Sequence, residues 1–213
     1  MPDSDFSQSR ASMVKDQISK RGINDPTVLE AFGSIPRHLF VPKNKIDSAY
    51  SDGPLAIGYD QTISQPYIAA LMTEILQLKP GLSALEIGTG SGYQAAILAY
   101  LGIKVYTIER IKNLGQKASD RFKALGYDIK VKISDGTLGW PEYAPYDRII
   151  ITAAAWSVPD ALMDQLKAGG RIVAPLGGRM HQNLTILDKT SDNRIKEKKV
   201  CGCVFVPLIG EGV

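Results

Sequence analysis

The stretch LEIGTGSGYQ, residues 85–94, decides the fold of this chain. An apolar strand pattern runs into Gly88, Gly90 and Gly92, and a helical pattern begins at Tyr93. In this strand–loop–helix context, small residues let a ligand approach the backbone closely, and the helix start offers unpaired N–H groups. The stretch therefore predicts a nucleotide-like cofactor at the carboxyl end of a parallel strand.

Strands and helices alternate after this loop. Following a first strand at 83–87 and the helix from Tyr93, the pattern predicts strands at 104–108, 129–133, 147–152 and 170–176, with helices at 111–125 and 159–167. Such alternation is typical of a doubly wound, mostly parallel α/β sheet. The tail at 183–208 lacks a helical period and predicts a C-terminal hairpin with its turn near 191–193, which brings the sheet to seven strands.

The residues before the loop predict an N-terminal helical extension. One helix ends at a capping Gly22, and a second begins at Asn24 or Asp25 with Pro26 in its first turn. We expect residues 1–80 to form this extension and residues 81–213 to form the core, in one structural domain.

A third helix is expected over residues 65–78, after a polar loop at 54–67. Its cap is Ser64 or Gln65, with Pro66 in the first turn. Ser64 could be a nucleophile, a ligand contact or a simple cap. The surrounding residues, TIS, lack the G-x-S-x-G pattern of hydrolases, so we reject the nucleophile.

Composition limits the class of protein. The chain has 213 residues, 44% of them hydrophobic and 22% charged, which suits one globular domain with a full core. The net charge of +3 is spread along the sequence, and the basic clusters DNRIKEKK and KVK are expected on solvated strand and turn faces, so no nucleic-acid partner is predicted. No apolar run approaches the roughly 20 residues of a membrane helix, and no signal peptide opens the chain, so a soluble, cytoplasmic protein is expected.

Cysteine and histidine are scarce. Cys201 and Cys203 lie two apart in a strand-like segment and are expected to be core thiols rather than a disulfide. Only His38 and His181 could join them around a metal, so no metal site is predicted. Because no Ser, Cys or acid is near His38 in sequence, it is expected to be packed rather than catalytic.

Glu109 ends the strand after the glycine loop, 21 residues beyond Gly88. An acidic side chain there can accept hydrogen bonds from both hydroxyls of a ribose. The alternative is a surface carboxylate paired with Arg110 or Lys112. Position and residue type favour the ribose.

The spacing of the glycines discriminates between dinucleotides and S-adenosylmethionine. Dinucleotide loops carry G-x-G-x-x-G, but here the third glycine comes one residue early and Tyr93 takes its usual place. Glu86 lies two residues before Gly88, where a buried carboxylate would disfavour a pyrophosphate and could bind an amino group or a water.

LEIGTGSGYQAAILA and YTIER together resemble the first two cofactor motifs of class I S-adenosylmethionine-dependent methyltransferases. Adding PLAIGYDQTISQPYIAALM, SDGTLGWPEYAPYDRIIITAAA, LKAGGRIVAPLG and FVPLIGE narrows the resemblance to the protein-L-isoaspartate O-methyltransferase family, over about residues 12–211. It implies a Rossmann-like fold, S-adenosylmethionine as methyl donor with S-adenosylhomocysteine as product, and isoaspartyl proteins and peptides as substrates, methylated on their free α-carboxylate. The resulting ester cyclises to a succinimide. The protein is expected to be a monomer.

The resemblance also implies roles for individual residues. Asp135 and Gly136 would meet the adenine, although an Asp-Gly pair is equally natural as a simple turn. Cofactor contacts would come from Gln61, Thr62, Ile63, Glu86, Gly88, Thr89, Gly90, Ser91, Gly92, Glu109, Arg110, Asp135, Gly136 and Thr152. Substrate contacts would come from Ile57, Ser64, Val206, Pro207 and Leu208, the last three otherwise being an ordinary strand end. The family often has arginine at the position of Val204 and proline at that of Ala56.

A carboxylate is ionised at neutral pH, so its attack on a sulfonium methyl needs no general base. Ser64 would then donate its hydroxyl to the incoming carboxylate at a helix start, against the alternative of a plain N-cap. Gly58 could act as a pivot of the loop. Two rivals are a methyltransferase for a small molecule or an RNA base, and a binding module without catalysis. TAAAW at 152–156 lacks the Asn/Asp-Pro-Pro pattern typical of base methyltransferases.

Overall fold

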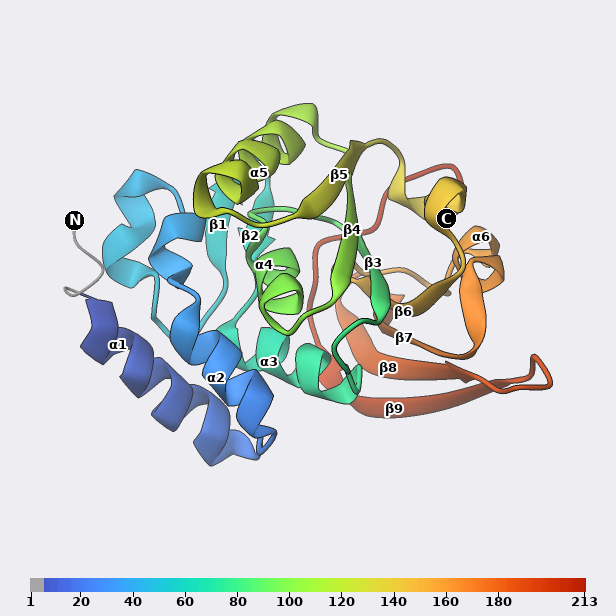
Figure 1. Cartoon of the computed structure of the whole chain (residues 1–213), viewed down its shortest axis with the longest axis horizontal. Coiled ribbons are helices and arrows are strands. Elements are labelled where there is room, and N and C mark those ends of the chain that lie inside the picture. The colour runs from blue at the N-terminus through green and yellow to red at the C-terminus, as the bar shows by residue number, and fades with distance from the viewer. Residues whose placement is uncertain (1–5) are drawn as a thin grey trace.

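The structure, a computed structural model, describes residues 6–213 and is built on a seven-stranded sheet (Figure 1). The strands lie in the order β5-β4-β3-β6-β7-β8-β9. Their bounds are β3 (Ser83–Ile87), β4 (Lys104–Glu109), β5 (Ile129–Ile133), β6 (Tyr146–Ile151), β7 (Leu166–Gly178), β8 (His181–Lys189) and β9 (Ile195–Cys203). The five strands from β5 to β7 pair in parallel, whereas β8 is antiparallel to both β7 and β9. The predicted sheet and its terminal hairpin are confirmed.

Both faces of the sheet are covered. Successive strand residues point to opposite faces, so Ala84 and Ile150 belong to a core that includes residues of α4 (Tyr93–Tyr100) and α5 (Lys112–Leu125). Leu85 and Ile149 belong to a second core with Leu162 of α6 (Asp160–Asp164). The doubly wound prediction is therefore confirmed. Helix α6 is shorter than the predicted 159–167, because the chain has already entered β7 at Leu166.

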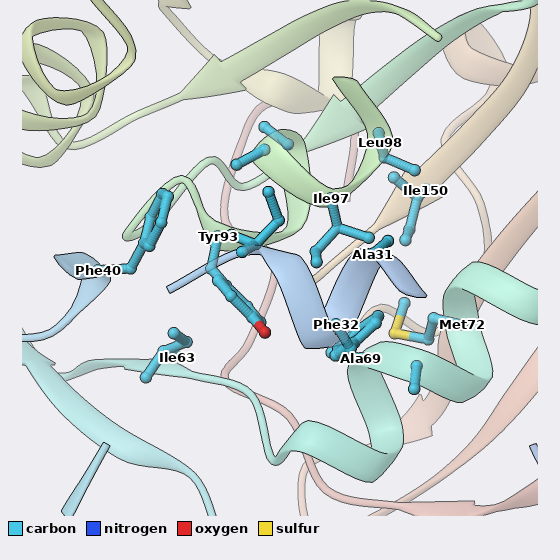
Figure 2. Packing of buried hydrophobic residues seen from close by; sticks show 14 of the residues in the cluster. Ala31, Phe32, Phe40, Ile63, Ala69, Met72, Tyr93, Ile97, Leu98 and Ile150 are labelled. Carbon is cyan, nitrogen blue, oxygen red and sulfur yellow. The ribbon is translucent and has the colours of Figure 1, made fainter. Parts of the chain in front are cut away.

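The N-terminal extension is helical, as predicted. It consists of α1 (Ser7–Ser12), a π-helical segment (Met13–Ile18), α2 (Pro26–Ser34) and 3₁₀ turns at Ser19–Arg21, Arg37–Phe40 and Lys43–Ser48. Gly22 ends the first helical run with φ of +97°, and Asp25 caps α2 by accepting from the N–H of Thr27 at 2.8 Å. These helices share the core of α4 and the sheet, as Figure 2 shows for Phe32 and Tyr93.

His38 is packed, as expected. Its imidazole is buried and lies 2.8 Å from the Tyr50 hydroxyl, and it stacks on the Phe6 ring with 4.4 Å between centroids. Its contacts are thus those of a core residue.

The loop at 54–67 contains a hairpin that the sequence did not reveal. Strand β1 (Leu55–Gly58) pairs with β2 (Gln61–Ile63), and α3 (Pro66–Ile75) follows. Tyr59 and Asp60, at the tip, both have φ of +56°, as a type I′ turn requires. The Tyr59 hydroxyl accepts from Asn113 Nδ2 at 2.7 Å, which ties the tip to α5.

The two edge strands carry lysines on solvated faces, as expected. On β9, residues 195–199 are exposed and include three lysines. On β5, Lys130 and Lys132 lie over the rings of Tyr143 and Trp140. Cys201 and Cys203 are free thiols on β9 that are half-buried and pack against the edge of the larger core. Within residues 6–213, no helix is both long and apolar enough to cross a membrane.

Candidate active site

The glycine loop lies at the topological switch point, where β3 and β6 neighbour each other and their connections run in opposite directions. Gly88 has φ of +96°, and a Cβ there would lie 2.5 Å from the hydroxyl oxygen of Thr152. Thr152 follows β6 and donates that hydroxyl to the carbonyls of Ile87 at 2.9 Å and Gly88 at 2.7 Å. Only glycine fits at position 88, and Thr152 fixes the loop from the neighbouring strand.

Glu86 is a fully buried carboxylic acid directly beneath the loop. Its Oε2 accepts from the Thr107 hydroxyl at 2.5 Å, and Thr107 in turn contacts the Thr89 hydroxyl at 2.6 Å. Its Oε1 has no hydrogen-bond partner in the described chain. Desolvation raises the pKa of Glu86 to about 8, against the opposing effect of the Thr107 bond. An unpaired acceptor is therefore held ready for a ligand that carries donors.

Glu109 is buried at the end of β4 and faces the loop. Its Oε2 accepts from the Gly90 N–H at 2.8 Å and its Oε1 from the Ile111 N–H at 2.9 Å. It forms no ion pair with Arg110 or Lys112, so the surface-carboxylate alternative is wrong. Each carboxylate oxygen can accept further bonds, and both remain available to a ribose.

The Asp135 carboxylate has protein partners. Its Oδ1 accepts from the N–H and hydroxyl of Thr137 at 2.8 and 2.7 Å, and its Oδ2 accepts from the Glu211 N–H at 2.7 Å. Burial opposes ionisation, but these donors outweigh it and hold the pKa of Asp135 below its usual value. Asp135 therefore caps the turn at Gly136–Leu138, as the turn-forming interpretation predicts. Its bond to the Glu211 N–H also tethers the C-terminal segment.

Ser64 lies between β2 and α3. The N-cap of α3 is Gln65, and no side chain caps the helix, so the interpretation of Ser64 as an N-cap is wrong. Gln65 still has a non-helical ψ of 139°, and the helix begins at Pro66, two residues after Ser64. The Ser64 hydroxyl makes no hydrogen bond within residues 6–213, whereas its carbonyl accepts from Arg37 Nη2 at 2.7 Å.

Two adjoining pockets gather the predicted cofactor residues. We name them the inner and the outer pocket. The inner pocket is lined by Thr62, Ile63, Ser64, Ala69, Met72, Glu86, Gly88, Thr89, Gly90, Ser91, Tyr93, Gln94 and Thr152. The outer pocket is lined by Gln61, Thr62, Ile87, Gly88, Gly90, Ile108, Glu109, Arg110, Gly136, Thr152, Ala153, Val206, Pro207, Leu208 and Ile209.

Three predicted residues lie outside these pockets. Gly92 packs beneath the loop, where a Cβ would lie 2.6 Å from the Phe122 ring. Asp135 forms the tether, and Ile57 reaches the loop near Gly90 instead of lining a pocket. Sequence reasoning missed several lining residues. Ala69 and Met72 lie in the helix expected over residues 65–78, and Tyr93 and Gln94 lie in the helix expected from Tyr93, but the sequence indicated no ligand contact for any of them.

A third cavity of about 310 Å³, the side pocket, also opens beside Ser64. It is lined by Pro54, Thr62, Ser64, Gln65, Ile68, Thr152, Gly202, Cys203, Val204, Phe205 and Val206. Val206 lines both the side pocket and the outer pocket, and the segment at 206–208 is held by mutual backbone bonds of 2.7 Å with Ala154. The inner and side pockets, as described, have no lysine, arginine or histidine in their linings.

This arrangement favours a ligand with an amino group and a ribose. A pyrophosphate would face the carboxylates of Glu86 and Glu109, whereas an amino group and two hydroxyls would find acceptors there. Within residues 6–213 no group of three potential metal ligands converges. Ser64 lies where the inner and side pockets meet, between the cofactor side and residues 202–206, which run from the end of β9 into the C-terminal segment.

Comparisons with known proteins agree with this geometry. The family profile of protein-L-isoaspartate(D-aspartate) O-methyltransferase matches residues 8–212. The chain is 52% identical to protein-L-isoaspartate O-methyltransferase of Dictyoglomus turgidum over 97% of this chain and 93% of that protein. It is 51% identical to the protein of that name from Geobacter metallireducens, over 97% and 96%.

Solved structures give the same result. A protein-L-isoaspartate O-methyltransferase superposes with a TM-score of 0.87 at 28% identity, over 95% of this chain and 67% of that one. A Plasmodium falciparum protein named as the same enzyme, in complex with S-adenosyl-L-homocysteine, gives a TM-score of 0.82 at 26% identity, over 94% and 98%.

Proposed function

The chain belongs to the protein-L-isoaspartate(D-aspartate) O-methyltransferase family, and from this membership we propose how its residues perform the reaction. The enzyme transfers a methyl group from S-adenosylmethionine to the free α-carboxylate of isoaspartyl residues in damaged proteins and peptides. The cofactor supplies a sulfonium-bound methyl group that a carboxylate oxygen can attack directly.

We assign the inner pocket to the amino-acid end of the cofactor and the outer pocket to its nucleoside. The unpartnered Oε1 of Glu86 would accept from the amino group, and Glu109 would accept from the ribose hydroxyls. Gly136 and the segment at 206–208 would enclose the adenine, with Asp135 acting mainly through its tether. The single observation that carries this assignment is the buried, unpaired Glu86 oxygen at the inner pocket.

Ser64 would orient the substrate. Its free hydroxyl can donate to one oxygen of the isoaspartyl carboxylate, and the N-terminus of α3 adds partial positive charge nearby. No residue needs to remove a proton, because the nucleophile is already a carboxylate. Orientation and exclusion of water would account for the rate enhancement, and in-line placement alone can lower the activation barrier by on the order of 7 kcal/mol.

The peptide would bind in the side pocket along residues 204–208. Val206, Pro207 and Leu208 line the outer pocket, and Val206 also lines the side pocket, so an extended chain in the side pocket would present its carboxylate to Ser64. We further propose that the enzyme acts as a monomer in the cytoplasm. We expect no nucleic-acid partner, since the small net charge of +3 is spread along the chain.

The activity is tested with radiolabelled methyl transfer to two peptides that differ only in isoaspartate or aspartate. We expect base-labile label on the isoaspartyl peptide alone. Equal labelling of both peptides, or of neither, would contradict the substrate assignment.

The role of Ser64 is tested with Ser64→Ala. Loss of a hydrogen bond to a charged group should lower kcat/KM roughly 10- to 100-fold, with a Tm within about 2 °C of wild type. Ser34→Ala is the matched control, because it removes a 3.0 Å bond to the Tyr100 hydroxyl outside all three pockets. Wild-type kinetics in Ser64→Ala would exclude the orienting role.

A further inference from the structure

Arg37 is a buried cation without a counter-ion. Its side chain is 0% exposed, and no ion pair in the described part of the chain includes it. Its Nε donates to the Ala49 carbonyl at 2.9 Å and its Nη2 to the Ser64 carbonyl at 2.7 Å, while Nη1 has no partner. Its guanidinium carbon lies 5.0 Å from the centroid of the Tyr93 ring.

These contacts join three segments of the chain around the inner pocket. Arg37 and Ala49 belong to the N-terminal extension, Ser64 precedes α3, and Tyr93 begins the helix after the glycine loop. Tyr93 is itself buried, with its ring edge-on to Phe32 and Phe40 at centroid distances of 5.8 and 5.4 Å (Figure 2). One side chain therefore fixes Ser64 relative to the inner pocket.

Burial of an unpaired guanidinium opposes folding, because two carbonyls and a ring face replace water only in part. A neutral side chain of similar volume would remove that desolvation cost. Burial lowers the pKa of Arg37, yet an arginine stays protonated at neutral pH. The buried charge thus has no evident benefit in stability alone.

The site offers a reason for the charge. The substrate brings a carboxylate to Ser64, and neither of the two pockets that Ser64 lines contains a cationic side chain. Arg37 is the cation in direct contact with Ser64, through the Ser64 carbonyl. The Ser64 hydroxyl has no partner of its own in the described chain, so its direction depends on how the backbone is held.

We propose that Arg37 is a positioning residue for methyl transfer, which anchors Ser64 through its carbonyl and places a buried positive charge behind the substrate carboxylate. This inference rests on the proposed function of Ser64. Arg37 itself touches neither substrate nor cofactor, since it lines neither of the Ser64 pockets.

The test is Arg37→Met, which keeps the apolar length of the side chain and removes both charge and donors. We expect KM for the isoaspartyl peptide to rise at least 10-fold, with the dissociation constant of S-adenosylhomocysteine changed less than threefold. Arg37→Lys keeps the charge and can keep one carbonyl bond, so it should restore most of the peptide KM.

A matched control is Arg148→Met. Arg148 is a half-buried arginine that also donates to backbone carbonyls, those of Leu76 at 2.6 Å and Gln77 at 3.1 Å, just beyond the C-terminal end of α3. It should lower Tm without changing the peptide KM. A double variant completes the design. In a Ser64→Ala background, Arg37→Met should raise KM by a smaller factor than in the wild-type background, because the part of its effect that acts through the hydroxyl is already lost.

Three outcomes would overturn the inference: an unchanged peptide KM in Arg37→Met, equal losses of peptide and S-adenosylhomocysteine affinity, or additive effects of Arg37→Met and Ser64→Ala. If Arg37→Met does not fold, Arg37→Gln decides, because it removes the charge but can keep one carbonyl bond. A positioning role then predicts a raised peptide KM, whereas a purely structural arginine would give a Tm loss without a shift in peptide KM. A wild-type enzyme that does not methylate the isoaspartyl peptide would instead contradict the proposed function.

Discussion

Glu86 shows how one residue's surroundings set its chemistry. A carboxyl group that would ionise near pH 4 in water is fully buried at the end of β3, with one oxygen bonded to Thr107 and the other unpaired. Its pKa of about 8 means that the free enzyme holds it mostly protonated at neutral pH. A cationic amino group at Oε1 would reverse that balance.

We therefore predict proton release on cofactor binding. Below pH 8 the free carboxyl is mostly protonated, and binding of the cationic amino group favours the ionised form, so affinity should rise as the pH approaches 8 from below. Calorimetry of S-adenosylhomocysteine binding near pH 7, in buffers of different ionisation enthalpy, should report up to about one proton released.

Glu86→Gln is the matched variant, since it keeps the shape and removes the titration. It should bind more weakly and release no proton. If wild type also releases none, Glu86 does not meet the amino group.

Among single elements, the C-terminal segment at 204–213 carries more of the site than its irregular backbone suggests. Residues 206–209 line the outer pocket, and the chain beyond them is tied down at the Glu211 and Gly212 N–H groups, to Asp135 at 2.7 Å and to Thr137 at 3.0 Å. The tether therefore holds a wall of the nucleoside site.

We predict that deletion of residues 210–213 weakens S-adenosylhomocysteine binding about 10-fold, because two hydrogen bonds, one of them to a charged group, no longer fix the wall. Asp135→Ala should have a similar effect in the same calorimetric measurement. Glu211→Ala should bind normally, since only its backbone N–H is used. Weak binding in Asp135→Ala beside normal binding in the deletion would show instead that Asp135 acts on the adenine.

How far sequence predicts each element depends on the range of its determinants. Strands β3 and β5 were predicted to the residue, because alternating apolar side chains and flanking turn residues are local signals. The β1–β2 hairpin was missed: its strands have four and three residues, and its Tyr59-Asp60 tip lacks the Asn-Gly or Asp-Gly signature. The sequence also left the cap of α3 open between Ser64 and Gln65, because a proline in the first turn fits either residue as the cap.

The residues of the site likewise differ in whether their positions have local or long-range determinants. Glu86, Gly88 and Glu109 stand at fixed distances from a strand–loop–helix pattern, so their position could be predicted from sequence. Arg37 could not, because its partners lie 12 and 27 residues away in sequence, with only tertiary packing to bring them together. The Asp135 tether joins residues 76 apart and has no local signal either.

At the scale of the whole molecule, the N-terminal extension and the sheet share one core. A single cluster of buried residues includes Phe32 of α2, Met72 of α3, Tyr93 of α4 and Ile150 of β6 (Figure 2). Because of this continuity, we expect no boundary at residue 80 at which one part could unfold alone. The extension thereby becomes a structural support of Ser64 rather than an appendage.

We predict that Phe32→Ala destabilises the whole protein by about 3–5 kcal/mol, the usual cost of deleting a buried aromatic ring. Far-ultraviolet circular dichroism and tryptophan fluorescence should still give one coincident transition, although both tryptophans lie in the 81–213 core. Loss of helical signal before the fluorescence change would mean that the extension unfolds independently.

The lysines of the two edge strands affect how substrate chains can pair with the enzyme's own sheet. Unpaired strand edges can recruit other chains as additional strands, which is a hazard for an enzyme whose substrates are damaged proteins and peptides. Solvated lysines along β9, together with those of β5, make such edge-to-edge annealing costly. The enzyme can thus hold a damaged segment at its active site while its own sheet resists co-aggregation with it.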